Sequence, residues 1–249
     1  MAQGNSCTTY TMKTLISTIP LLVALTGLLR AASPASAPAN ADFEKKLADI
    51  DARAGKIQDF TARFEQQKFT ALLRKPLLSS GTIRVVGALV RWDTEKPEPS
   101  VLYADGKELK MYYPKQKLLE VYPIDRRMAD LVASPIPRLT VLKEKFSFQP
   151  LPLEEAKKDA PDLGEKPEMV SVQLRPTDAF LKEHVREVRV LLDGKSARML
   201  CVTTVDADGD RTVMRFSDVR ENAGVKPADV QLVVPADVKV SRPLEGVGN

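Results

Sequence analysis

Apolar and polar side chains alternate with a period of two along most of this chain. Phe60, Ala62 and Phe64, for example, are separated by polar residues, so one face of an extended strand is apolar and the other is polar. The pattern predicts about eleven strands. They include the run around 60–64 and the segments 79–86, 88–93, 99–104, 107–113, 117–122, 145–149, 168–175, 185–192, 197–205 and 211–219, and the chain ends with strand-like 230–234 and 237–241.

Turn signals between these runs predict antiparallel pairing. Asp105-Gly106, Asp193-Gly194 and Asp208-Gly209 each separate two alternating segments, and Asp-Gly is a strong hairpin signal. In such a sheet one face meets water and the other packs against something apolar. The chain is therefore predicted to be mainly β (α+β), with a single curved antiparallel sheet that forms one domain over residues 42–249.

Helical segments are few. Three are predicted, at 42–54, at 125–133 running into 138–144, and at 153–159. In the first, apolar residues recur at helical spacing from Phe43 to Ala54. Short helices of this kind are expected to cover the concave side of the curved sheet.

The apolar face of the predicted sheet is rich in methionine and aromatic residues. If the helices fill the concave side only in part, a hydrophobic cavity remains, and methionine suits irregular, exchangeable ligands because its side chain is flexible and polarizable. The candidate cavity residues are Phe64, Val90, Trp92, Tyr103, Leu109, Met111, Tyr113, Met199, Met214 and Phe216. The alternative, that these side chains pack a solid core, stays open on the pattern alone.

The N-terminus is predicted to be a targeting segment. Lys13 precedes an apolar run, Leu15–Leu29, which is shorter than the roughly 20 residues of a transmembrane helix. Small residues follow, and Ala39-Asn40-Ala41 fits the A-x-A pattern of a cleavage site. Residues 1–41 are therefore predicted to be a signal peptide that is removed on export. The alternative is an uncleaved membrane anchor.

Composition leaves little room for catalysis. The chain has one histidine and two cysteines, too few for a histidine-rich metal site or a disulfide scaffold. His184 is interpreted as a surface or hinge residue, and Cys201 as a buried free thiol. Asp206–Asp210 lacks the glycine and glutamate positions of an EF-hand and is interpreted as a hairpin turn. No enzyme activity, cofactor or metal is predicted.

Charge gives no support for nucleic-acid binding. The formal net charge is +4, but residues 1–41 hold two basic residues and no acidic one. Their removal leaves 35 basic residues against 33 acidic ones. No long Lys/Arg tract accompanies this balance, and a nucleic-acid partner is therefore not predicted.

Several short segments occur in an order that is similar to that of a known family. They are 57–66 (IQDFTARFEQ), 80–83 (SGTI), 90–92 (VRW), 105–106 (DG), 111–114 (MYYP), 119–122 (LEVY), 190–194 (VLLDG), 206–210 (DADGD), 215–216 (RF) with Asn222, and 233–238 (VVPADV). Through these segments the chain resembles, over about residues 42–242, the outer-membrane lipoprotein carrier family of LolA-type periplasmic proteins.

The resemblance implies a fold and a function. The fold is an unclosed β-barrel with a helical lid, and the candidate residues above then line a lipid-binding cavity. The function is that of a periplasmic carrier, which binds acyl chains of lipoproteins and transfers them from the inner towards the outer membrane without a cofactor. The implied partners are lipoprotein or lipid acyl chains, an inner-membrane ABC release complex and an outer-membrane acceptor, and a monomer is expected. The alternative is a LolA-fold envelope sensor or structural module that binds a lipoprotein or a partner without transport.

One segment departs from the family pattern. Members often have a basic residue and a proline before the aromatic residue of the third strand, and the basic residue helps to hold the lid. Here residues 85–89 fill this stretch and contain neither. Arg84 and Arg91 are the basic residues on either side of it, and they are the candidates for the same role.

Overall fold

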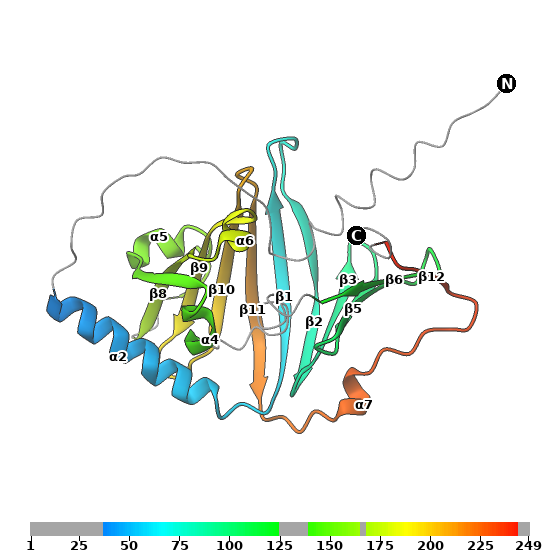
Figure 1. Cartoon of the computed structure of the whole chain (residues 1–249), viewed down its shortest axis with the longest axis horizontal. Helices are drawn as coiled ribbons and strands as arrows, with labels where there is room; N and C mark the ends of the chain where they lie inside the picture. The colour runs from blue at the N-terminus through cyan, green and yellow to red at the C-terminus, as the bar shows by residue number, and fades with distance from the viewer. Residues whose placement is uncertain (1–36, 125–138, 165–167, 244–249) are drawn as a thin grey trace.

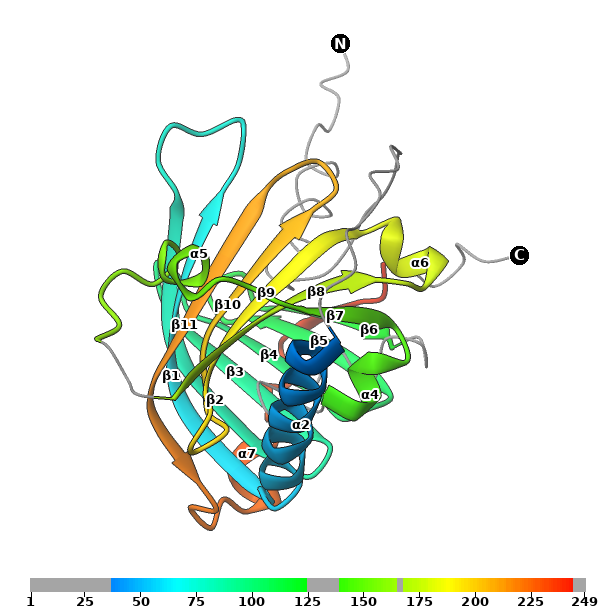
Figure 2. The same cartoon turned by 90° about the vertical axis from the view of Figure 1, so that its left-hand side faces the viewer.

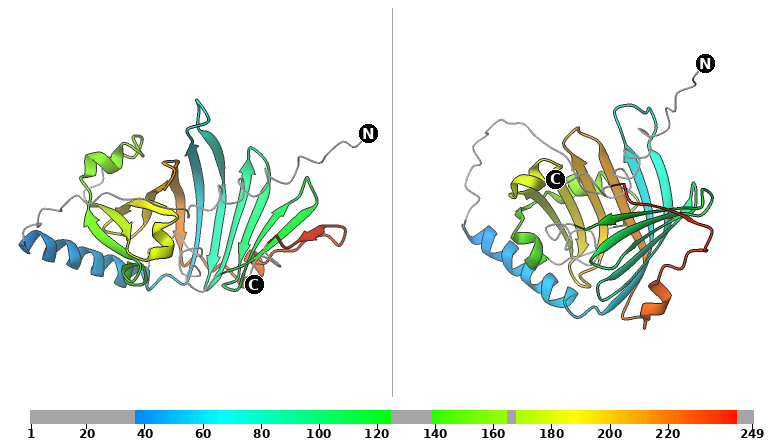
Figure 3. Two further views of the ribbon diagram at one scale, coloured as in Figure 1. Left: turned by 45° about the horizontal axis from the view of Figure 1, so that its top comes forward. Right: turned by 45° about the vertical axis from the view of Figure 1, so that its right-hand side comes forward.

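A computed structural model describes residues 37–124, 139–164 and 168–243. Within these residues one large sheet dominates, and one long helix and several short ones lie beside it (Figures 1 and 3). The elements are α2 (Ala37–Ala54), β1 (Asp59–Phe69), β2 (Leu77–Val86), β3 (Leu89–Lys96), β4 (Ser100–Ala104), β5 (Glu108–Tyr113), β6 (Leu118–Pro123), α4 (Leu139–Lys143), β7 (Phe146–Pro150), α5 (Leu153–Lys157), β8 (Met169–Pro176), α6 (Ala179–Lys182), β9 (Val185–Asp193), β10 (Met199–Asp206), β11 (Arg211–Glu221), α7 (Pro227–Val230) and β12 (Lys239–Ser241).

The described strands form one twelve-stranded sheet in the order β12-β6-β5-β4-β3-β2-β1-β11-β10-β9-β8-β7. All neighbours are antiparallel except β12, which runs parallel to β6. The edge strands β12 and β7 are not paired with each other within the described residues, so the sheet is not closed. The predicted mainly β class and the unclosed sheet are confirmed. The prediction of a purely antiparallel sheet is wrong at one edge.

The segment 230–234 is not a strand, contrary to the prediction. Residues 227–230 form α7, because Pro227 suits a first helical turn and the Asp229 carboxylate accepts a hydrogen bond from the Lys226 amide at 2.8 Å. The carbonyl oxygen of Gln231 then accepts a hydrogen bond from the Arg91 side chain at 2.8 Å, and not from a neighbouring strand.

The predicted helices are confirmed where the structure describes them. The first begins at residue 37 instead of 42. Most of the second prediction, residues 125–138, lies outside the described residues, and its end forms α4. The third is α5, which ends at Lys157. The short helix α6 was not predicted; it begins where the Asp178 carboxylate caps the Leu181 amide at 2.9 Å.

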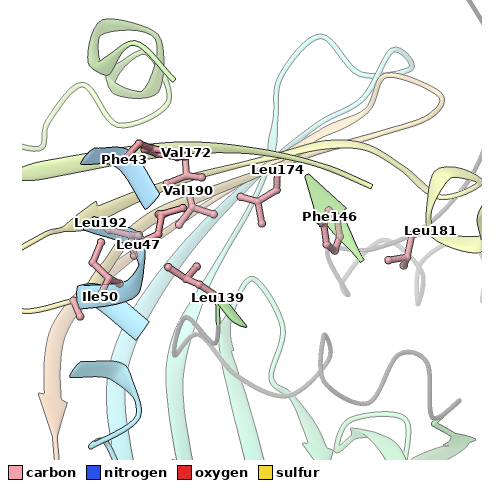
Figure 4. Close-up of a cluster of buried hydrophobic side chains, with 11 residues drawn as sticks. Phe43, Leu47, Ile50, Leu139, Phe146, Val172, Leu174, Leu181, Val190 and Leu192 are labelled. Atoms are coloured by element: carbon pink, nitrogen blue, oxygen red, sulfur yellow. The ribbon is translucent and has the colours of Figure 1, made fainter. Parts of the chain in front are cut away.

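The apolar residues on one side of α2 pack against β8 and β9 of the sheet. Phe43, Leu47 and Ile50 are buried beside Val172 of β8 and Leu192 of β9 (Figure 4). Their spacing of four and three residues places them on one side of the helix. This face of the sheet, the one that α2 covers, is called the inner face below. Figure 2 shows the sheet curving around α2 and α4.

The opposite, outer face is also covered over β9 to β11. Leu191 and Leu192 are adjacent and point to opposite faces. Leu192 packs beneath α2, whereas Leu191 packs with Ala156 of α5 and with Cys201. Three layers therefore meet here, and the prediction that one face meets water does not hold for these strands. No helix in the described part of the chain is long and apolar enough to cross a membrane.

Candidate functional site

Cross-strand register places two candidate residues, Trp92 and Met111, in one row with apolar residues of two neighbouring strands. Ile83 of β2 lies opposite Trp92, Trp92 opposite Leu102, and Leu102 opposite Met111. Directly opposed residues share a face of the sheet. Ile83 and Trp92 pack in one apolar cluster, and Met199 contacts both this cluster and the cluster beneath α2. This row therefore belongs to the inner face. The neighbouring row holds Val90, Ala104 and Leu109.

Three aromatic rings form the centre of the inner face. The ring of Trp92 lies 5.2 Å from that of Phe64 and 6.4 Å from that of Phe216, centroid to centroid, at tilted and edge-on angles of 57° and 67°. Such arrangements are favoured because the positive ring edge meets the negative ring face. Phe64 and Phe216 are direct partners across β1 and β11. Met214 is buried in the same cluster.

A second apolar cluster lies on β5 and β6. Leu109 and Met111 are buried there, and Tyr113 packs against them. Ile124, which follows β6, contacts both this cluster and the aromatic one. The inner face is therefore a continuous apolar surface from β5, through the aromatic centre, to Met199 on β10.

One carboxylate interrupts this apolar surface. Glu120 lies opposite Met111 and is only 4% exposed. It accepts a hydrogen bond from the Tyr122 hydroxyl at 3.1 Å. Burial, and then the negative charge of Glu120, raise the pKa of both Tyr113 and Tyr122, so both phenols stay neutral hydrogen-bond donors at ordinary pH.

The sequence pattern did not predict that Glu120 is buried on the inner face. In β6 the apolar residues Leu119 and Val121 point to the outer face and are buried there. Glu120 and Tyr122 occupy the inner positions between them. In an alternating strand a charged residue is expected on the face that meets water. In β6, however, Glu120 lies on the buried inner face.

Tyr103 is not part of the inner face, and its assignment to the cavity is wrong. It pairs with Arg91 on one side and with Lys110 on the other, both on the outer face. The Lys110 ammonium lies 5.7 Å from the centroid of its ring. The inner position of β4 belongs to Leu102, because register with Trp92 and not the size of the side chain decides the face. The other candidate residues all lie on the inner face.

Arg84 and Arg91 do not act on the inner face. Both bind Asp93, at 2.5 Å and 2.8 Å. Arg84 also donates to the carbonyl oxygen of Asp229 at 3.1 Å, and Arg91 to that of Gln231. They fix α7 to the outer face, and the suggestion that either replaces the lid residue of the family is not supported.

His184 is buried and not a surface residue, which corrects part of its interpretation. It is 9% exposed, and its ring lies 4.4 Å from that of Phe180 in an edge-on contact. Burial lowers its pKa. It lies in the chain between α6 and β9. Within the described residues, no group of three or more His, Cys, Asp or Glu side chains is arranged to hold a metal.

The fold and the inner face define a protein of the unclosed-barrel class, in which a curved sheet and covering helices enclose apolar side chains. The chain belongs to the outer membrane lipoprotein carrier protein LolA family, whose model matches residues 55–230.

Two curated relatives carry the name outer-membrane lipoprotein carrier protein. The protein from Idiomarina loihiensis is 25% identical over 184 residues, which cover 74% of this chain and 80% of that protein. The protein from Dechloromonas aromatica is 24% identical over 180 residues, with 72% and 79% covered. Among solved structures, an uncharacterized conserved protein from Thermus thermophilus matches with a TM-score of 0.49 at 12% identity, over 81% of this chain and 99% of that one.

Proposed function

We propose that this chain is a periplasmic carrier that binds acyl chains of lipoproteins on its inner face and transfers them from the inner towards the outer membrane. The observation that supports it is the continuous apolar surface from Met111 through Trp92 to Met199. The names of the two curated relatives favour the same function. An inner-membrane ABC release complex and an outer-membrane acceptor are the partners that such a route requires.

The chemistry of the inner face suits an acyl chain. Each methylene that leaves water contributes about 0.8 kcal/mol, so one chain supplies ample affinity without a specific polar contact. Met111, Met199 and Met214 are unbranched and adapt to chains of different shape. Glu120 and Tyr122 form a hydrogen-bonded polar pair within this apolar face. Release then depends on movement of the covering elements or on a competing cavity in the acceptor.

The proposal includes export. Residues 1–41 act as the signal peptide, and cleavage after Ala41 leaves Asp42 as the first residue. N-terminal sequencing of protein from the envelope fraction tests this step. An intact segment Leu15–Leu29 in the membrane pellet contradicts it and supports the anchor.

Trp92 gives a direct test of binding because it is the only tryptophan of the chain. A fatty acid brominated along its chain quenches tryptophan fluorescence only when the bromine reaches the ring. We expect saturable quenching of Trp92 by the brominated acid and recovery when an unbrominated one competes. Absence of quenching, together with absence of lipid in protein purified without detergent, supports the solid core and refutes the carrier.

Two neighbouring substitutions on β5 make the test specific. Met111→Ala is expected to weaken acyl binding more than it lowers stability, because a side chain against a ligand lacks close packing on one side. A methionine in a filled core instead loses roughly 2–5 kcal/mol on truncation. Lys110→Ala is the control, since Lys110 points to the outer face and binds Glu108 at 3.1 Å. A binding loss at Lys110 alone contradicts the inner-face site.

Transport itself is tested with two membranes. Protein loaded from inner-membrane vesicles that contain a labelled lipoprotein is expected to deliver the label to outer-membrane vesicles. A sensor or structural module instead binds the lipoprotein or another envelope protein stably, without delivery. Stable capture without delivery therefore replaces the carrier with the alternative, even if the Trp92 measurement shows acyl binding.

A further inference from the structure

The hairpin that joins β1 and β2 exposes an unusual number of leucines. Leu72 is 92% exposed, Leu73 47%, Leu77 53% and Leu78 61%. The hairpin projects beyond the neighbouring ends of β10 and β11 (Figures 1 and 2). Clustered apolar side chains on a soluble surface mark a contact with another molecule or a membrane, whereas single ones are ordinary.

The base of the hairpin is fixed to the rest of the sheet. The Arg211 guanidinium lies 4.2 Å from the centroid of the Phe69 ring. The Ala71 amide donates to the Asp210 carboxylate at 3.3 Å, and Lys68 lies 3.8 Å from the same group. Leu72 and Leu73 lie just beyond these contacts, whereas Leu77 and Leu78 lie at the start of β2, opposite Lys68 and Gln67, beside the fixed base. The chain is therefore anchored up to residue 71 and presents its apolar tip outward.

The leucines do not share one face of the hairpin. Leu77 lies opposite Lys68, and Leu78 opposite Gln67. Adjacent residues of a strand point to opposite faces, and both leucines are more than half exposed. The tip is thus apolar on both sides. A flat protein partner covers only one side of such a ribbon, whereas a lipid layer surrounds it.

Positive charge lies within the same tip. Arg74 and Lys75 are exposed and stand between the two pairs of leucines. Basic residues next to apolar ones are the composition of segments that lie in the headgroup region of a bilayer and meet anionic lipids. We propose that the tip, residues 72–78, docks this protein on an anionic phospholipid membrane by inserting its leucines between the headgroups.

Docking through the tip does not require the inner face to carry acyl chains. It does bring the end of β1 to the membrane, and β1 also carries Phe64 of the inner face. The membrane contact is measured with vesicles alone, and acyl binding with Trp92 quenching in the absence of vesicles. The two proposals therefore fail separately.

The experiment is flotation of the protein with vesicles of phosphatidylcholine, with or without phosphatidylglycerol. The full chain is expected to float with the anionic vesicles. Leu72→Ser combined with Leu73→Ser is expected to weaken this binding by roughly tenfold or more, since burial of one leucine alone corresponds to about that factor. Arg74→Gln combined with Lys75→Gln is expected to weaken binding roughly fivefold per charge on anionic vesicles, and to have no effect on phosphatidylcholine vesicles.

Val233→Ser is the matched control, because Val233 is an exposed apolar residue, 80% exposed, outside the tip. Every variant keeps the same N-terminal apolar run, so a difference between them reports the tip. Far-ultraviolet circular dichroism of each variant confirms that the sheet is formed. Equal flotation of the double leucine variant and the Val233 control overturns the proposal. Loss of an envelope protein partner in the leucine variant, with no vesicle binding by the parent protein, overturns it in favour of a protein contact.

Discussion

The ring of Phe64 lies 5.2 Å from that of Trp92, although their strands are separated by β2. The residue of β2 directly opposite Phe64 is Gly81. A Cβ atom on Gly81 would meet the carbonyl oxygen of Asp93 at 1.9 Å and the Phe64 ring at 3.0 Å. The absence of a side chain on β2 therefore allows the two rings to meet above it.

Gly81→Ala is expected to lower the free energy of unfolding by about 1–3 kcal/mol, the range for overpacking of a filled site. The clash is with backbone, which cannot turn aside as a flexible side chain does. Urea denaturation measures the change. Gly164→Ala is the control, because an added Cβ there meets nothing within 4 Å. Equal midpoints for the two variants contradict the close approach at Gly81.

Asp59 holds the end of β11 against the start of β1. Its carboxylate accepts hydrogen bonds from the amides of Ala223 at 2.6 Å and Gly224 at 3.1 Å, and it is 8% exposed. Asp59→Ala leaves both amides without their acceptor and is expected to cost about 1–3 kcal/mol. A thermal or urea melt measures the loss. Asp208→Ala, at an exposed turn position, is expected to change stability by less than about 0.5 kcal/mol.

His184 is expected to make the fold less stable in mild acid. Burial lowers its pKa below the ordinary value of 6.5, so the folded state binds the proton less readily than the unfolded state. This contribution to stability is full above pH 6.5 and is lost as the pH falls through the lowered pKa of the folded state.

The measurement uses the fact that His184 is the only histidine. Its imidazole proton signals in an NMR titration are expected to shift with a midpoint below 6.5. In His184→Gln the free energy of unfolding is expected to change less between pH 7 and 5 than in the parent protein, because the contribution of the histidine is removed. A midpoint at or above 6.5 shows that the ring is accessible to water.

Cys201 is expected to be unreactive in the folded protein. Burial, and next the negative charge of Asp159, raise its pKa to about 11. At pH 8 the thiolate fraction is then on the order of 100-fold smaller than for an ordinary thiol. Cys7→Ser leaves Cys201 as the only thiol, and its reaction with a thiol reagent is expected to be slow in buffer and fast in denaturant. Fast reaction in buffer contradicts the three-layer packing over β9 to β11.

Local pattern was enough to predict the twelve described strands and most of the inner face, although it also predicted a strand at 230–234 that does not form. The alternation of Phe60, Ala62 and Phe64 reflects a two-residue repeat that any extended chain has. The apolar residues on one side of α2 reflect the helical repeat in the same way. Asp105-Gly106 forms its turn because glycine accepts a positive φ, which is 82° at Gly106. Each of these features depends on residues that are close in sequence.

The side chains that the sequence misplaced depend on neighbours that are distant in sequence. Tyr103 and Leu102 are equally apolar in pattern, and only the register with Trp92 decides which one faces inward. Glu120 is buried because its strand runs beside Met111 and places Tyr122 next to it. Register is set by the pairing of whole strands, and the alternation of residues within one strand does not determine it.

By itself, the sequence determined the class of fold, the places where strands turn and the apolar character of one face, because these follow from periodicities within single segments. Tertiary structure alone decided the second covered face over β9 to β11, the parallel edge strand β12 and the exposure of the tip at Leu72 and Leu78. Exposure and coverage depend on which elements come to lie against a segment. Four leucines in a sequence suggest core, and only the folded chain shows that nothing in its described part covers them.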